Sequence, residues 1–135
     1  MRESLDELDT LPIYIFDRKQ YSIDEIRAIS RNIKKKVGKI AAIFVDYLGI
    51  MNIPQERGMT YSQAVGRVTT KAKGLAIELS CPFVLLSQLN RETEKHTQPS
   101  LSHLRDSGSI EQDADVVEFL YEVDNDSPNR NPFGS

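Results

Sequence analysis

Only one cysteine, Cys81, occurs in the 135 residues, so the chain cannot form an intrachain disulfide. It stands just ahead of an apolar run, where a small buried thiol is expected rather than a nucleophile. No apolar run is long enough to cross a bilayer, and the acidic, polar N-terminus does not have the pattern of a signal peptide. The two histidines, His96 and His103, lack cysteine or glutamate at metal-binding spacing, which argues against a zinc site. These absences favour a reducing, cytoplasmic setting.

The sequence also lacks an excess of positive charge. Its 17 basic and 20 acidic residues give a net charge of -3. The isoelectric point of about 5.4 is far below that of a protein with a broadly basic DNA-binding surface. Contact with nucleic acid would therefore need a few placed groups, or charge summed over several subunits. With 39% hydrophobic and 27% charged residues, the chain should form one globular domain.

Four short apolar runs are typical of β-strands. They occupy residues 11–16, 40–45, 82–86 and 116–121, and two segments of helical periodicity separate the first three. The runs at 40–45 and 82–86 are apolar without interruption, as in parallel sheets that are covered on both faces. The order β-α-β-α-β predicts an α/β fold with a mostly parallel sheet and flanking helices.

Two helices are expected between these runs. Ser22 with Glu25, and Thr60 with Gln63, have the spacing of capping boxes at helix starts, and Gly38 follows the end of the first helix. The basic face of the first helix could contact DNA, although an ordinary solvated surface explains it better. The apolar face of the second helix consists of Ala64, Val68, Ala72, Leu75 and Leu79.

Polar residues follow two of the predicted strands directly. Asp46 comes after residues 40–45, and Ser87 and Gln88 come after residues 82–86. Ligands of parallel α/β sheets bind beyond the carboxyl ends of the strands. A carboxylate there can hold Mg²⁺ through its water shell, and an amide on the next strand can reach a terminal phosphate. Each signal is weak alone, because many strands end in polar turn residues.

Three motifs make the combination specific. Asp-Tyr-Leu at 46–48, Leu-Ser-Gln-Leu-Asn-Arg at 86–91 and Leu-Arg-Asp-Ser-Gly-Ser-Ile-Glu-Gln-Asp-Ala-Asp at 104–115 follow one another. Together they closely resemble the second half of the motor domain of the DnaB-type replicative helicases, ring ATPases with a RecA-like fold. The resemblance extends from about residue 11 to residue 121. It implies an ATP-dependent DNA helicase that forms a hexameric ring, uses ATP and Mg²⁺, acts on single-stranded DNA, and works with a helicase loader and a primase.

The resemblance also implies a role for each matching residue. Asp46 matches the Walker B aspartate at the metal, and Gln88, with Ser87 beside it, matches the γ-phosphate sensor. The loop that grips the single-strand backbone is matched by Arg105, Asp106 and Gly108. Arg105 can pair with a phosphate, and several copies around a channel would make it locally positive in an acidic ring. The family usually has glutamate at the second loop position, and a carboxylate there would orient Arg105 or contact DNA through its backbone N–H.

The loop that binds nucleotide phosphates is missing. No Gly-x-x-x-x-Gly-Lys-Ser/Thr motif occurs in the chain, and the family's catalytic glutamate and arginine finger are not matched either. We therefore expect residues 1–121 to form the second half of a RecA-like ATPase domain, followed by a flexible polar tail at 122–135. The chain alone should neither bind ATP tightly nor hydrolyse it. Because part of its sheet is exposed, it should either self-associate or be a fragment of a longer chain.

Three alternatives compete with this hypothesis. A receiver domain would use Asp46 as phosphoacceptor, but it needs an acidic pair after the first strand, where Asp17 is followed by Arg18 and Lys19. A recombinase of the same fold is disfavoured by the motif at 105–115. A truncated, catalytically inactive helicase remnant that binds protein or DNA stays open.

Overall fold

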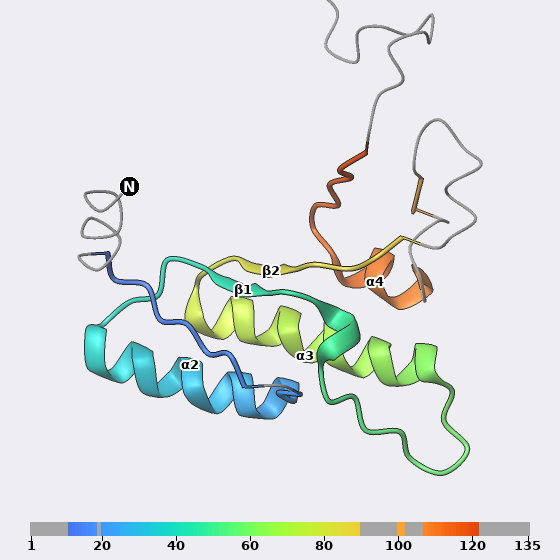
Figure 1. The fold of residues 1–135 in the computed structure, drawn as a ribbon, viewed down its shortest axis with the longest axis horizontal. Coiled ribbons are helices and arrows are strands. Elements are labelled where there is room, and N and C mark those ends of the chain that lie inside the picture. The colour runs from blue at the N-terminus through green and yellow to red at the C-terminus, as the bar shows by residue number, and fades with distance from the viewer. Residues whose placement is uncertain (1–10, 19, 90–99, 102–106, 122–135) are drawn as a thin grey trace, which may run out of the picture.

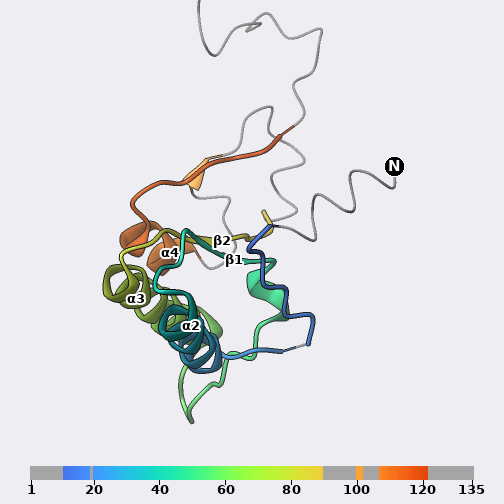
Figure 2. The same ribbon diagram turned by 90° about the vertical axis from the view of Figure 1, so that its left-hand side faces the viewer.

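A two-stranded parallel sheet and two long helices form the frame of the computed structural model, which describes residues 11–18, 20–89, 100–101 and 107–121. The elements along the chain are α2 (Ile23–Val37), β1 (Ile43–Val45), the 3-10 helix η1 (Leu48–Ile50), α3 (Tyr61–Leu79), β2 (Phe83–Leu85) and α4 (Ser107–Asp113). Figures 1 and 2 show α2 and α3 side by side on the same face of the sheet. The α/β class with a parallel sheet and flanking helices is confirmed. No helix within the described ranges is long and apolar enough to cross a membrane.

Both long helices begin where the sequence predicts. The Glu25 N–H donates to the Ser22 hydroxyl at 3.3 Å, and the Glu25 carboxylate accepts from the Ser22 N–H at 2.9 Å. Thr60 and Gln63 make the same reciprocal pair at 3.2 and 2.9 Å. Each pair satisfies N–H groups that the first turn of a helix leaves unpaired. Gly38 ends α2 with φ of +87°, a conformation that disfavours residues with a side chain.

The core lies between α3 and its neighbours. The predicted apolar face of α3 is buried at all five positions, and Val65 and Leu75 are fully enclosed. Ile23 of α2 belongs to the buried cluster around Val65, and Phe83 of β2 packs both against this cluster and against the one around Leu75. Cys81 is also buried, and loss of solvent raises the pKa of its thiol, although Lys34 opposes the shift. The cysteine is therefore a packing residue, as its position before an apolar run indicates.

The register of the sheet brings the ends of both strands to one edge. Val45 lies opposite Leu85 in the parallel pair. Beyond it, the Leu86 N–H donates to the Val45 carbonyl at 3.0 Å, and the Leu48 N–H donates to the Leu86 carbonyl at 2.8 Å. The two chain segments therefore stay hydrogen-bonded to each other past the ends of β1 and β2. The residues that follow both strands begin at the same edge of the sheet.

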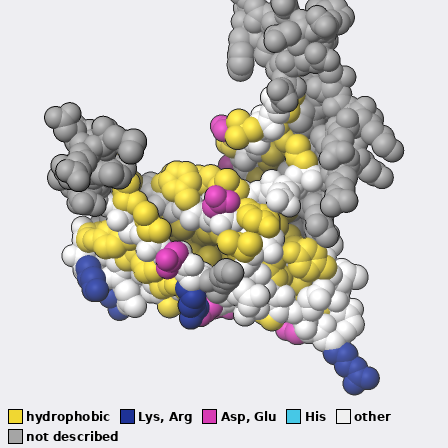
Figure 3. All heavy atoms as spheres, in the orientation of Figure 1, with side chains coloured by type: hydrophobic (Ala, Val, Ile, Leu, Met, Phe, Trp, Pro, Cys, Tyr) yellow, Lys and Arg dark blue, Asp and Glu magenta, His cyan; other side chains and the backbone are white. Residues whose placement is uncertain are grey.

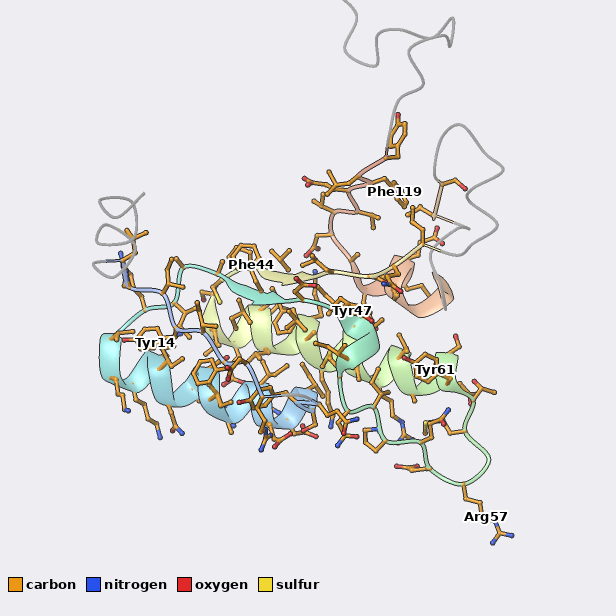
Figure 4. All side chains as sticks on the ribbon, viewed as in Figure 1. Tyr14, Phe44, Tyr47, Arg57, Tyr61 and Phe119 are labelled. Atoms are coloured by element: carbon orange, nitrogen blue, oxygen red, sulfur yellow. The ribbon has the colours of Figure 1, made fainter. Side chains whose placement is uncertain are left out.

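Two expectations about the sheet are wrong. Residues 11–16 and 116–121 are not strands; Ile15 is 84% exposed and Leu120 is 96% exposed. A strand needs a neighbour to satisfy its backbone groups, and neither run pairs with β1 or β2. Burial on both faces is also wrong for the described part of the chain. Phe44 is 71% exposed, and Figure 4 shows it pointing away from the helices.

A short helix that was not predicted from the sequence lies between β2 and residues 116–121. Residues 107–113 form α4, which packs along α3. Figure 1 shows α4 at the end of the sheet, above α3. Residues 90–99 and 102–106, and the tail predicted at 122–135, lie outside the described residues.

Candidate functional site

Asp46 and Gln88 lie at the same edge of the sheet. Asp46 follows β1 directly, and Gln88 follows β2 after Leu86 and Ser87. Because β1 and β2 run parallel with Val45 opposite Leu85, both side chains leave the sheet at its carboxyl end. This is the end at which parallel α/β sheets bind their ligands.

The exposure pattern also places both residues on one face of the sheet. Side chains alternate between the faces of a strand, and Phe44, Val84 and Leu86 are the exposed members here. Asp46 and Gln88 are exposed and continue the same alternation, so they lie on the face that α2 and α3 leave uncovered. Figure 3 shows hydrophobic side chains gathered over this part of the molecule. The candidate site is thus a carboxylate and an amide beside an open apolar surface.

Both polar groups are available to a ligand. Within the described ranges, neither the Asp46 carboxylate nor the Gln88 amide has a hydrogen bond or ion pair to another side chain. No group of three or more His, Cys, Asp and Glu side chains in these ranges could hold a metal by itself. A Mg²⁺ ion at Asp46 would therefore take its other ligands from water and from phosphate oxygens, which is how Mg²⁺ is usually held at nucleotides. A lone strand-end carboxylate fits that arrangement.

The predicted DNA-binding residues are only partly within the described ranges. Arg105 and Asp106 lie outside them, and Gly108 is the second residue of α4. Gly108 is therefore part of a helix, whereas the sequence placed it in an open loop. The helix that contains it, α4, packs along α3.

The basic face of α2 is largely engaged with α3. Arg27 donates to the Glu78 carboxylate at 3.0 Å and Arg31 donates to it at 2.6 Å, while the Lys34 ammonium donates to the Leu79 carbonyl at 3.0 Å. Arg31, helped by Arg27, lowers the pKa of Glu78 to about 2. These three basic side chains therefore tie the two helices together, which argues against a free DNA-binding surface there.

Surface hollows lie away from the strand ends. One is formed by the loop at 51–60 and the start of α3, where Arg57 points away from the body of the molecule (Figure 4). Another runs along α3 toward Asp113. Both are open and shallow, and neither includes Asp46 or Gln88. They do not define a competing site.

Sequence reasoning missed one polar cluster. Asp113 accepts hydrogen bonds from Thr69 and Thr70, and Thr69 is only 6% exposed. A buried hydroxyl among the apolar residues of α3 was the available signal, since buried polar groups almost always have a partner. The partner itself could not be identified, because Asp113 is more than forty residues away along the chain.

Comparisons with known proteins identify the family of the chain. The family described as DnaB-like helicase C terminal domain matches residues 1–132. The chain is 38% identical over 133 residues to the replicative DNA helicase DnaB of Geobacillus stearothermophilus, covering 95% of this chain and 29% of that protein. It is 42% identical over 125 residues to the replicative DNA helicase DnaB of Leifsonia xyli, covering 87% of this chain and 27% of that protein. The chain therefore spans less than a third of the length of these relatives.

Solved structures give the same result. A DnaB-like replicative helicase, described with its interactions with primase, superposes with a TM-score of 0.83 at 32% identity, covering 95% of this chain and 32% of the other. A second solved structure, described as an ATPase domain, superposes with a TM-score of 0.83 at 33% identity, covering 96% of this chain and 48% of the other. The chain belongs to the family of DnaB-like helicase C-terminal domains.

Proposed function

We propose that this chain supplies three parts of a replicative ring helicase that couples ATP hydrolysis to translocation on single-stranded DNA and to duplex unwinding. These parts are the Walker B strand, the γ-phosphate sensor and the DNA-binding segment. The observation that carries the proposal is the shared position of Asp46 and Gln88, both exposed at the carboxyl edge of one parallel sheet. Membership of the helicase family supports it.

At the nucleotide, each residue would act through a different atom. The Asp46 carboxylate would accept hydrogen bonds from the water shell of Mg²⁺ at the β- and γ-phosphates of ATP. The Gln88 amide N–H would donate to the γ-phosphate, with the Ser87 hydroxyl beside it. Gln88 is three residues beyond Leu85, which packs against the core. Loss of the phosphate would therefore change the contacts of a residue that is attached to a firmly packed strand.

At the DNA, the guanidinium of Arg105 would pair with backbone phosphates, with Asp106 and Gly108 next to it. Phosphate contacts fix position without reading sequence, which suits an enzyme that moves along any strand. A hexameric ring would gather several copies of Arg105 around one channel, so an acidic chain can still bind DNA. Primase and a helicase loader are the expected partners, and one structural relative is described with primase. The setting would be the cytoplasm.

The chain alone should be inactive as an ATPase. Its sequence has no Gly-x-x-x-x-Gly-Lys-Ser/Thr motif, so no lysine and no glycine-rich loop are present to bind the phosphates. The same absence favours a second candidate, a catalytically inactive helicase remnant that binds protein or DNA. The two candidates differ in whether residues 11–121 can work when a phosphate-binding half is supplied.

A chimera tests this directly. Residues 11–121 replace the matching segment of the Geobacillus stearothermophilus helicase, and ATP hydrolysis is measured with and without single-stranded DNA. We expect DNA-stimulated hydrolysis. Asp46→Asn should reduce it about a hundredfold or more, because the water shell of the metal loses the charged carboxylate that accepts its hydrogen bonds. The matched control is Asp24→Asn, an equal change of charge at an exposed carboxylate of α2; it removes only an exposed ion pair with Lys71, which contributes little, so activity should be retained.

Three results would contradict parts of the proposal. Full activity of the Asp46→Asn chimera would exclude the Walker B role. An assembled chimera without any hydrolysis would favour the inactive remnant. Metal-dependent hydrolysis by the 135-residue chain alone, abolished by Asp46→Asn, would refute the expected inactivity.

A further inference from the structure

The short helix η1 holds the chain directly after Asp46. Its turn is closed by a hydrogen bond from the Ile50 N–H to the Tyr47 carbonyl at 3.1 Å. Leu48 is 5% exposed, and its side chain lies in a buried cluster together with residues of α2 and α3. The backbone is therefore anchored in the core two residues beyond Asp46.

The same turn joins the ends of the two strands. The Leu48 N–H donates to the Leu86 carbonyl at 2.8 Å. Leu48 is two residues after Asp46, and Leu86 is two residues before Gln88. A displacement of η1 would therefore change the backbone beside both residues of the candidate site.

An aromatic ring lies against the backbone of η1. A β-carbon added to Gly49 would lie 2.5 Å from Cε2 of Tyr47, 3.2 Å from Cδ2 and 3.4 Å from Cζ. Carbon atoms in contact are ordinarily about 3.5–4.0 Å apart, so the Tyr47 ring fills the place that a side chain at this position would need. Tyr47 is half-buried, and Figure 4 shows it at the end of β1, beside η1.

Close approach of the ring, and not backbone conformation, requires glycine at position 49. Gly38 and Gly58 are the glycines with positive φ in the described part of the chain, and Gly49 is not among them. The three heavy atoms nearest to the added carbon all belong to Tyr47. The backbone of η1 therefore accepts a side chain here, and the Tyr47 ring opposes it.

We propose that Tyr47 is a positioning residue for Asp46: its ring, seated on Gly49, holds η1 and with it the direction in which the Asp46 carboxylate leaves the sheet. The inference rests on the proposed function, because Asp46 needs a fixed direction only if it serves the metal at the nucleotide. Groups of such a site must be held to within about 0.5 Å by well-fixed neighbours. The Asp46 carboxylate has no hydrogen bond or ion pair to another side chain in the described ranges, so its backbone must fix it.

The first test needs no nucleotide and uses the full 135-residue chain. Nuclear Overhauser contacts should join the Tyr47 ring protons to the Gly49 α-protons, and the Leu48 amide should exchange slowly. Tyr47→Ala and Gly49→Ala should each speed exchange of the Leu48 amide about tenfold, while the amides of α3 keep their rates. Gly74→Ala is the matched control, because a carbon added to Gly74, on an exposed part of α3, meets nothing within 4 Å.

A double variant tests whether the two residues act through each other. If Gly49→Ala acts by displacing the ring, Tyr47→Ala removes the conflict, and adding Gly49→Ala to it should change exchange less than about twofold. Additive effects of the two substitutions would contradict the contact. Tyr47→Phe keeps the ring and should behave like the parent.

The second test measures metal dependence in the chimera with the Geobacillus stearothermophilus helicase. Loss of a group that orients a metal-site residue commonly lowers metal affinity about 10- to 100-fold. We expect the Mg²⁺ concentration for half-maximal ATP hydrolysis to rise about tenfold in Tyr47→Ala and in Gly49→Ala, and to stay unchanged in Tyr47→Phe and Gly74→Ala. A role in folding alone would lower the maximal rate and leave the Mg²⁺ midpoint where it is. Tyr47→Ala adds no atoms, so it carries the test if Gly49→Ala does not assemble.

Asp46→Asn is measured alongside, so that this inference and the proposed function can fail separately. If Asp46→Asn abolishes hydrolysis while Tyr47→Ala leaves the Mg²⁺ midpoint unchanged, the positioning role is wrong and the proposed function stands. If Tyr47→Ala leaves exchange of the Leu48 amide unchanged, the ring does not hold η1, and the positioning role is wrong as well. If Asp46→Asn leaves hydrolysis intact, the metal-side role of Asp46 is wrong, and the role of Tyr47 is wrong with it.

Discussion

The two faces of the β1–β2 sheet differ in what covers them. On one face, Leu85 packs into the cluster around Val65, and the helices α2 and α3 exclude water. On the other face, Phe44 is 71% exposed and Val84 is 38% exposed (Figure 4). The strands are apolar at every position, although a strand with one face in water usually alternates apolar and polar residues.

The difference indicates that these strands are suited to a sheet with a layer of structure on each face. The described residues provide one of these layers, the helices α2 and α3. The matched region makes up 48% of the solved ATPase domain that superposes on this chain, which leaves that relative enough chain for a second layer. The open face carries Asp46 and Gln88 at its edge, so the missing cover and the proposed nucleotide would meet at the same place. An ATP site and a complete sheet are therefore expected to form together.

The largest expected effect concerns the covered face. Leu75→Ala removes a fully buried side chain of α3 and should cost about 2–5 kcal/mol of unfolding free energy, through lost burial and a cavity. Ile77 lies two residues further along the same helix and is 68% exposed, so Ile77→Ala should change stability by about 0.5 kcal/mol or less. Urea titration followed by circular dichroism measures both. Equal losses would mean that the core is not where the structure places it.

A second prediction concerns the open face. Phe44→Ser should leave the unfolding free energy nearly unchanged, because the side chain is already exposed. It should weaken self-association of the chain by about ten- to a hundredfold, because burial of one large apolar side chain is worth about 1.5–3 kcal/mol. Sedimentation velocity at several concentrations measures this. Ile77→Ser is the control, since it makes the same kind of change on the helical side.

Either of two outcomes would break the comparison between the faces. If Ile77→Ser reduces self-association as much as Phe44→Ser, association is not specific to the open sheet. If Phe44→Ser destabilises the monomer as strongly as Leu75→Ala, the face is covered in solution by residues outside the described ranges.

The helices could be predicted from the sequence because their signals are local. Each capping box lies within four residues, and Ser22 with Glu25 and Thr60 with Gln63 form as expected. The edge shared by Asp46 and Gln88 also followed, since parallel strands must end on the same side. Their chemical roles stay predictions, because they depend on a nucleotide and on further chain.

The misses have one physical cause, dependence on distant residues. Residues 11–16 and 116–121 have strand composition, but a strand exists only where a partner is available. Helix α4 is held by Ile110 in the core and by Asp113 on Thr69, two contacts that no local pattern encodes. Context outside a segment decided its structure in each case.

The smallest expected effect is at the junction of α2 and α3, on the covered side. Glu78 receives hydrogen bonds from Arg31 and Arg27, which lower its pKa from an ordinary 4.5 to about 2. A carboxylate whose pKa is depressed by folding stabilises the folded state fully above the ordinary value, and this contribution is lost as the pH falls toward the folded value. The loss should therefore occur between about pH 4.5 and pH 2.

The test compares melting temperatures of the parent and Glu78→Gln across that range. At neutral pH the variant should melt slightly lower, because it lacks the carboxylate that pairs with Arg31; the effect is small since the pair is exposed to solvent. The difference should shrink below pH 4.5 and vanish near pH 2, where Glu78 of the parent becomes neutral. Glu118→Gln, which breaks no ion pair in the described part of the chain, controls for the change in net charge. A difference that stays constant down to pH 2 would mean that the charge of Glu78 does not join the helices, and that Arg27 and Arg31 are not held by it.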